Sequence, residues 1–225
     1  MQGEVLKALI VATHPDDEVL GCGGVMARYA AAGGHVEVLV ITRGIPEIFP
    51  ESEIESTREE LRRAHHLLGV RDVEFLDFPA PRLDSVPTHQ LADKIHLVIR
   101  RFAPHTVYVP HPGDLHADHK AVYYAALVAT RPIDGCSVKR LLCYETLSET
   151  EWASPVGGEN FVPTMFVDIS AHLSTKLDAM NCYKSQLRSA PHPRSLTAIE
   201  ALARVRGASI SVAAAEAFVL VRGIE

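Results

Sequence analysis

Apolar segments of β-strand type recur along the chain with helix-like segments between them, and this alternation limits the fold more than any other feature. The segments are Leu6–Ala12, His35–Ile41, Val73–Leu76, Thr106–Pro110 and Lys139–Tyr144. Alternation of this kind is typical of a parallel sheet built from βαβ units. The sequence therefore predicts an α/β fold with a doubly wound, Rossmann-like, mostly parallel sheet flanked by helices. A chain of 225 residues has the length of one such domain, which we assign to residues 1–225.

Helical periodicity and helix-ending residues locate the remaining elements. Helices are predicted at Val19–Ala32, Ser52–Leu68, Asp93–Phe102 and Ala117–Ala129. Beyond the fifth strand the pattern predicts a strand at Phe161–Ile169, helices at Ser170–Leu187 and Leu196–Val205, and a final apolar run at Ala213–Val221. The segment Glu149–Pro163, which contains two adjacent glycines, has the composition of a mobile surface loop.

Histidine and carboxylate side chains cluster directly after the first and the fourth predicted strands. The first cluster is His14-Pro15-Asp16-Asp17-Glu18, and the second runs from His111 to His119. In a doubly wound sheet of order 3-2-1-4 these strands are neighbours, and their carboxyl ends flank the crevice at the switch point. An acidic helix start would explain the first cluster alone. The two clusters together predict one metal site.

The spacing within the clusters suggests which side chains bind the metal. Catalytic zinc typically takes three protein ligands from His, Asp or Glu and keeps one position for water. His14 and Asp17 are three residues apart, and His116 and His119 have the same spacing. Spacing alone does not choose between His116 and His119. Our hypothesis is a His14, Asp17 and His119 ligand set that leaves Asp16 and His116 for proton transfer.

These motifs resemble those of the PIG-L/LmbE-like N-deacetylase family. The resemblance rests on His-Pro-Asp-Asp-Glu at 14–18 and His-x-Asp-His at 116–119, and it extends through most of the chain by weaker matches at 56–61, 144–145, 183–186, 206–207 and 215–218. It implies zinc bound by His14, Asp17 and His119, with Asp16 as the general base. It further implies that His116 stabilises the oxyanion and that Arg58 binds substrate.

The chemistry of a zinc hydrolase fits these residue types. Zinc lowers the pKa of a bound water from about 15.7 to about 7, which provides a nucleophile for an amide carbonyl. We expect a cationic His116, held in its charged form by Asp118, to donate to the developing oxyanion. Asp114 and Tyr144 join Arg58 as candidate substrate-binding residues. The expected cofactor is Zn²⁺, with Fe²⁺ or Co²⁺ as alternatives.

The predicted function is hydrolysis of the N-acetyl group of an N-acetylglucosamine-type amino sugar or its conjugate, which releases acetate. One alternative is an amidase that acts on a thiol-sugar conjugate or another non-acetyl amide. A second is a nucleotide-binding protein that uses Gly21-Cys22-Gly23-Gly24 as a phosphate loop. The neighbouring carboxylates would repel a pyrophosphate, and G-x-G-x-x-G is missing from the sequence. A non-catalytic relative is disfavoured because every polar group that the mechanism needs is in the sequence.

Composition restricts the partners and the compartment. The net charge of −6, with mixed signs and no basic stripe, argues against nucleic acid as a partner. The start of the sequence lacks a basic segment followed by an apolar one, and no apolar run is long enough to span a membrane. Four cysteines without C-x-x-C spacing are expected to be reduced thiols. We therefore expect a cytoplasmic protein with a small-molecule substrate and a plausible homo-oligomeric state. Isolated histidines, including His65, are treated as ordinary packing or surface residues.

Overall fold

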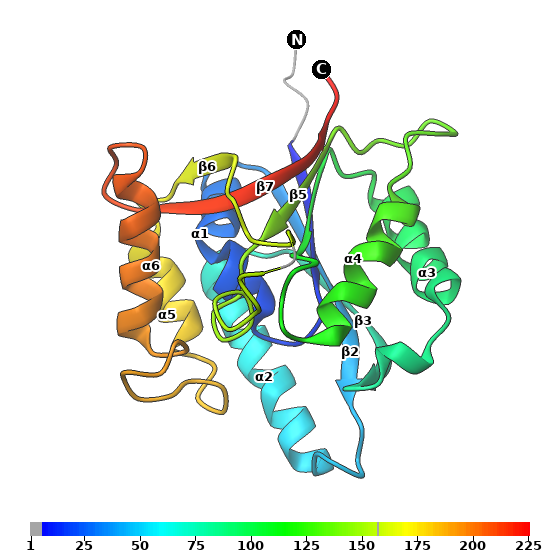
Figure 1. Cartoon of the computed structure of the whole chain (residues 1–225), viewed down its shortest axis with the longest axis horizontal. Coiled ribbons are helices and arrows are strands. Elements are labelled where there is room, and N and C mark those ends of the chain that lie inside the picture. Colours follow the sequence, from blue (N-terminus) through cyan, green and yellow to red (C-terminus); the bar gives the residue numbers. More distant parts are fainter. Residues whose placement is uncertain (1–5, 157) are drawn as a thin grey trace.

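A seven-stranded sheet with helices on both faces forms the body of the protein (Figure 1). The computed structural model describes residues 6–156 and 158–225. The strands are β1 Lys7–Ala12, β2 His35–Gly44, β3 Asp72–Ala80, β4 Thr106–Pro110, β5 Arg140–Tyr144, β6 Met165–Asp168 and β7 Ala215–Gly223. The helices are α1 Asp17–Ala31, α2 Glu51–Leu68, α3 Thr88–Phe102, α4 Ala117–Ala129, α5 Leu173–Met180 and α6 Leu196–Ala208, with a short 3₁₀ helix at Leu83–Ser85.

The strand order is β3-β2-β1-β4-β5-β7-β6. Strand β1 pairs in parallel with both β2 and β4, and β5 continues the parallel part beside β4. Strands β7 and β6 complete the sheet with antiparallel pairing. The predicted α/β fold is confirmed, and so is the adjacency of the first and fourth strands. The two histidine clusters therefore leave the sheet side by side at the switch point.

Alternating residues of the central strands supply two separate cores. Ala8, Ile10 and Ala12 of β1 face helices α1, α2, α5 and α6, whereas Leu9 and Val11 face α3 and α4. Figure 1 shows these two helical layers on opposite sides of the sheet. All five residues are fully buried, as expected for a central parallel strand covered on both faces. Across residues 6–156 and 158–225, no helix is both long enough and apolar enough to cross a bilayer.

The glycines of α1 allow close packing between the helix and its neighbours. A Cβ atom at Gly21 would lie 2.3 Å from the ring of Tyr144, and one at Gly24 would lie 2.6 Å from Ile169. Both glycines are buried inside a continuous helix. The alternative in which this stretch forms a phosphate-binding loop is therefore not supported, because its glycines serve helix packing.

The chain differs from the predicted elements mainly between β6 and α6. The helix predicted to end at Leu187 ends at Met180, and the predicted strand Phe161–Ile169 contains only β6. After Met180 the chain turns so that Tyr183 enters the core. This inward turn is a tertiary contact, and helical periodicity carries no information about it.

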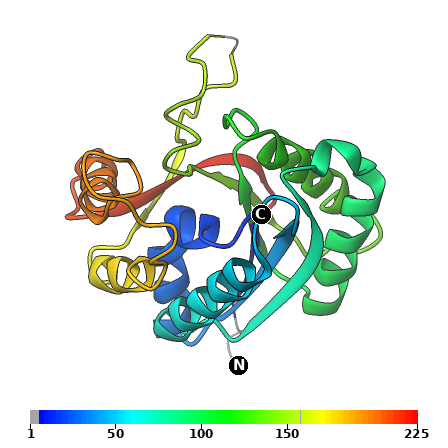
Figure 2. The ribbon, with the colours of Figure 1, turned by 90° about the horizontal axis from the view of Figure 1, so that it is seen from below.

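The segment between β5 and β6 contains the predicted loop Glu149–Pro163. Figure 2 shows its yellow-green trace projecting away from the helices. Glu159 pairs with Lys120 at 2.9 Å, and the backbone oxygen of Glu149 accepts from Leu115 at 3.0 Å. A Cβ atom at Gly113 would lie 1.8 Å from the Glu159 carbonyl oxygen, so this close approach requires glycine. The mobility of the loop stays a prediction.

Candidate functional site

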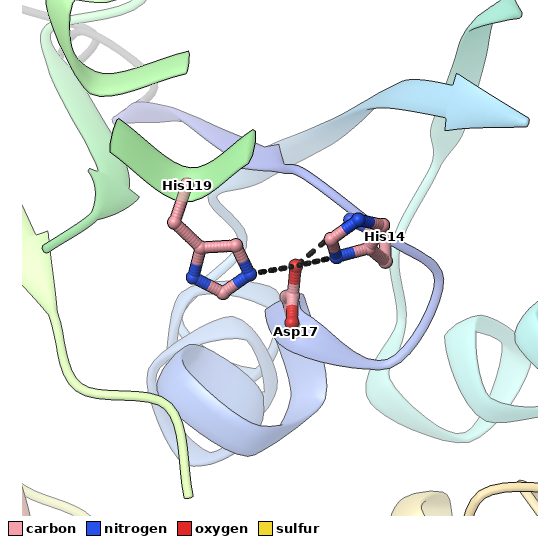
Figure 3. Close-up of side chains that lie close together, drawn as sticks. All are labelled: His14, Asp17 and His119. Atoms are coloured by element: carbon pink, nitrogen blue, oxygen red, sulfur yellow. Dashed lines mark hydrogen bonds and ion pairs between the residues drawn. The ribbon is translucent and has the colours of Figure 1, made fainter. Parts of the chain in front are cut away.

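Three predicted ligands converge where β1 and β4 end. His14 follows β1, Asp17 is the first residue of α1, and His119 lies in the first turn of α4. Asp17 Oδ2 is 3.3 Å from His119 Nε2 and 3.5 Å from His14 Nδ1. Figure 3 shows the Asp17 carboxylate between the two imidazole rings. The three donor atoms lie within 4.8 Å of one another. Buried His119 Nε2 lies 3.3 Å from Asp17 Oδ2 but forms no hydrogen bond of normal geometry with any residue that the structure describes, which leaves it able to bind a cation. The donor set fits a divalent metal with an open position.

Two buried carboxylates hold the outer nitrogens of the ligand histidines. Asp114 Oδ2 is 2.8 Å from His119 Nδ1, and Asp118 Oδ2 is 3.4 Å from His14 Nε2. Such contacts fix the orientation of a metal-binding imidazole and increase its basicity. Asp114 is a predicted substrate-binding residue and Asp118 the predicted partner of His116, and the structure places their carboxylates against the candidate ligands His119 and His14. Neither Asp114 nor Asp118 lines the cleft onto which Asp16 opens.

The pKa values of the three candidate ligands, His14, Asp17 and His119, are shifted by the charges that these residues and their neighbours carry. Burial alone would raise the pKa of Asp17, but the adjacent His119 holds it well below its usual range. Burial opposes the charge on His119, yet the Asp17 and Asp114 carboxylates raise its pKa to about 10. The pKa of His14 is also raised, by Asp118 and Asp17 acting against burial. Negative charge therefore surrounds the position that a cation would take.

Asp16 lies beside the candidate ligands. It belongs neither to the group His14, Asp17 and His119 nor to the second group of side chains that could hold a metal, His14, His116 and Asp118. Its backbone has φ of 117°, which is unfavourable for a residue with a side chain. The carboxylate is 2% exposed, and its Oδ2 is 3.3 Å from the guanidinium of Arg194. Burial raises the pKa of Asp16 to about 7, with the charge of Arg194 opposing the rise. A buried carboxyl of this pKa is suited to proton transfer near neutral pH.

A buried network supports the strained backbone of Asp16. Its N–H donates to Glu18 Oε2 at 3.0 Å. Glu18 Oε1 accepts from the Tyr183 hydroxyl at 2.5 Å and lies 3.1 Å from His65 Nε2. His65 is one of the histidines expected to be an ordinary packing or surface residue, and Tyr183, although it belongs to one of the weaker family matches, is not among the predicted site residues. Nothing in the local pattern connects either residue to Asp16.

His116 is the N-cap of α4. Its Nδ1 accepts the backbone N–H of Asp118 at 3.1 Å, so the proton of the neutral ring resides on Nε2. Burial lowers the pKa of His116, and positive charge on His14 lowers it further. The expected cationic His116 is therefore not supported, because Asp118 is directed to His14. The neutral ring still offers one N–H donor.

A cleft of about 570 Å³ opens onto this site, between the β2–α2 connection, α2 and the segment after α5. Asp16, His14 and His116 line it, and so does Arg58. The guanidinium of Arg58 pairs with Asp77 and lies 4.5 Å from the ring centre of Phe75. Its position agrees with the predicted substrate role, which stays a prediction.

Tyr144, the remaining candidate for substrate binding, does not line the cleft. Its side chain is fully buried, and its hydroxyl donates to the Val11 carbonyl at 2.9 Å. The expected substrate contact is therefore not supported. Tyr144 connects β5 to β1 and packs against Gly21 of α1.

Comparison with known proteins identifies the family. The family model described as GlcNAc-PI de-N-acetylase, PIG-L, matches residues 9–130. The chain belongs to the PIG-L family. The matched segment of this PIG-L chain includes all three candidate metal ligands together with Asp16 and His116, whereas Arg194 and Tyr183 lie outside it.

Individual relatives extend the likeness across the PIG-L chain. The uncharacterized deacetylase YaiS of Escherichia coli strain K12 is 31% identical over 79% of this chain and 90% of its own length. The diacetylchitobiose deacetylase of Thermococcus kodakarensis is 27% identical, with 81% and 71% covered. The crystal structure of the conserved protein TT1542 from Thermus thermophilus matches with a TM-score of 0.79 and 31% identity over 98% of this chain and 97% of that one. The predicted family and fold are thus confirmed.

Proposed function

We propose that this protein is a zinc-dependent hydrolase that removes the N-acetyl group from an N-acetylglucosamine-type amino sugar or its conjugate. The observation that carries the proposal is that three side chains able to hold a metal lie beside the buried carboxyl of Asp16, where a cleft lined by His14 and Asp16 opens. The names of the relatives, which include a diacetylchitobiose deacetylase, support the amino-sugar substrate. The donor set of two imidazoles and one carboxylate fits zinc and also admits Fe²⁺ or Co²⁺.

In the proposed reaction the candidate metal ligands and Asp16 have separate roles. His14, Asp17 and His119 would hold a divalent cation, which when bound would supply Lewis-acid activation of water and of the amide carbonyl. Asp16 accepts the proton of the attacking water and later gives it to the nitrogen of the leaving amine. The water oxygen first bonds to the carbonyl carbon, and the carbon–nitrogen bond then breaks as the carbonyl double bond reforms. The products are acetate and a free amino sugar.

His116 supplies the donor for the negative charge that develops on the carbonyl oxygen. Its Nδ1 is occupied by a backbone N–H, so Nε2–H is the group that donates. One donor aimed at a developing oxyanion contributes on the order of 3 kcal/mol to transition-state stabilisation. A neutral imidazole with a fixed tautomer meets this need, because the second nitrogen cannot compete for the proton.

The walls of the cleft suit a hydroxyl-rich substrate. Beside the catalytic groups they present small hydroxyl and amide side chains, namely Thr42, Ser56, Thr57, Ser185 and Gln186. Groups of this kind donate and accept hydrogen bonds, as sugar hydroxyls require. The cytoplasmic location and the homo-oligomer expected from the sequence stay predictions.

The test is acetate release from a panel of N-acetylglucosamine derivatives, including the free sugar, glycosides, nucleotide-linked forms and chitobiose. We expect release by the zinc-loaded protein and none after chelation. An Asp16→Asn variant should bind zinc stoichiometrically and lose on the order of 100-fold or more in kcat. Reconstitution with Co²⁺ or Fe²⁺ compares the alternative metals. Zinc binding without acetate release from any member would refute the proposed substrate class and favour another amide.

A further inference from the structure

A guanidinium from a distant part of the chain contacts the carboxylate of Asp16. Arg194 lies 178 residues further along the chain, in the segment between α5 and α6, and its Nη1 donates to Asp16 Oδ2 at 3.3 Å. Arg194 also lines the cleft that opens onto the ligand cluster. We propose that Arg194 is a positioning residue that holds the Asp16 carboxylate in the orientation needed for proton transfer. This inference rests on the proposed function, in which Asp16 is the general base.

Arg194 is itself fixed from several directions. Its Nε donates to Ser148 Oγ at 2.7 Å, and its Nη1 also donates to Gln186 Oε1 at 3.3 Å. Its Nη2 lies 3.5 Å from Glu149 Oε1. These partners come from the segment after β5 and the segment after α5. A planar guanidinium with several anchored N–H groups is rigid, so it can set the direction of a neighbouring carboxylate.

Asp16 needs such a partner because, among the residues that the structure describes, no other side chain donates a hydrogen bond to its carboxylate. The network of Glu18 restrains only the backbone N–H of Asp16. The carboxylates of Asp17 and Glu18 are its chain neighbours, and they repel it. The cation expected at the ligand cluster would attract it. The Arg194 contact holds the Asp16 carboxylate in place against both the repulsion by Asp17 and Glu18 and the attraction by the cation. The carboxylate therefore stays available for the proton of the attacking water.

The experiment compares Arg194→Ala with the wild-type enzyme in acetate release, with zinc content measured for both. We expect kcat to fall on the order of 100-fold, as for a displacement of about 1 Å in a reacting group, while KM changes by much less. Free guanidinium at a non-denaturing concentration should restore part of the kcat of this variant. Arg194→Lys should retain more activity than Arg194→Ala, because it keeps the charge.

The matched control is Arg204→Ala on the exposed face of α6. Arg204 donates to Glu200 through Nε and Nη2, so it is an ion-paired arginine away from the cleft. Its removal should leave kcat unchanged, and guanidinium should not raise it. Arg194→Ala with wild-type kcat would overturn the inference. The inference would also be overturned if Arg194→Ala is folded and zinc-loaded, its kcat is not raised by guanidinium, and Arg194→Lys has no higher kcat. Arg194 would then only shape the loop.

A measurement without substrate separates this inference from the proposed function. Melting temperatures of the metal-free wild type, Asp16→Asn, Arg194→Ala and the double variant form a cycle that reports coupling between the two side chains. Non-additive shifts support the contact even if no panel member releases acetate, in which case the proposed function alone fails. Additive shifts overturn the inference whatever the activity.

Discussion

Replacement of Tyr183 by phenylalanine tests the buried support of Asp16. The hydroxyl of Tyr183 donates to Glu18 Oε1 at 2.5 Å, and both side chains are fully buried. Burial and the nearby Glu18 raise the pKa of Tyr183 well above its usual range, so the hydroxyl stays protonated and donates. The variant removes this donor and leaves His65 Nε2 as the remaining contact of Oε1.

The expected cost follows from the kind of hydrogen bond that is lost. A hydrogen bond to a charged group contributes about 1.5–3 kcal/mol to the free energy of unfolding. In a chain of this length each kcal/mol changes Tm by roughly 2–4 °C, so Tyr183→Phe should lower Tm by roughly 3–12 °C. Since Glu18 Oε2 accepts the Asp16 N–H, kcat should fall as well, with bound zinc unchanged.

The assay is thermal unfolding of the zinc-loaded proteins, followed by acetate release at saturating substrate. Tyr124→Phe is the matched control, because Tyr124 is 46% exposed on α4. Removal of a surface hydroxyl should change stability by no more than about 0.5 kcal/mol. A Tm for Tyr183→Phe within about 2 °C of wild type would refute the reasoning. Lower stability with an unchanged kcat would mean that the network supports the fold but not the base.

Three further predictions follow from the site. Asp114→Asn should weaken zinc affinity by about 10- to 100-fold, measured by chelator competition, because Asp114 orients His119. Asp16→Gly and Asp16→Ala should both be inactive, but thermal unfolding should show the glycine variant to be the more stable by about 1 kcal/mol, since φ is 117°; equal stabilities would argue against backbone strain. In metal-free protein the raised pKa of His119 gives stability that is present below about pH 6.5 and is lost as pH rises through about 10. The Tm of chelated protein should therefore fall over this range more than that of zinc-loaded protein, in which the cation takes the place of the proton; parallel curves would contradict this.

The fold was predictable because its signals are local and its topology follows general rules. Apolar runs of the β1 and β4 type identify a covered parallel sheet, and the doubly wound order makes those two strands neighbours. The meeting of His14 and Asp17 with His119 follows from that adjacency. Only the choice between His116 and His119 needed more than spacing.

The roles of the surrounding carboxylates were not predictable, because they depend on the direction of each side chain. Asp118 is two residues from His116, yet its carboxylate contacts His14, which is 104 residues away. Its backbone N–H, in contrast, donates to His116. Sequence proximity therefore predicted a contact between His116 and Asp118, but it did not predict that the backbone N–H of Asp118 makes this contact and that the carboxylate does not. Tyr144 shows the same limit, since the end of a strand can place a side chain in the core as readily as at the site.

The candidate metal ligands and the side chains that surround Asp16 come from different parts of the chain. Residues 9–130 match the family model and contain the candidate ligands, Asp16 and His116. The side chains that hold the base come from beyond this segment, since Tyr183 supports Glu18 and Arg194 contacts Asp16. Strain at Asp16 persists only if the surrounding structure maintains it. The candidate metal ligands therefore all belong to the matched segment, whereas the side chains that contact Asp16 and Glu18 from outside it, Arg194 and Tyr183, belong to the last third of the chain.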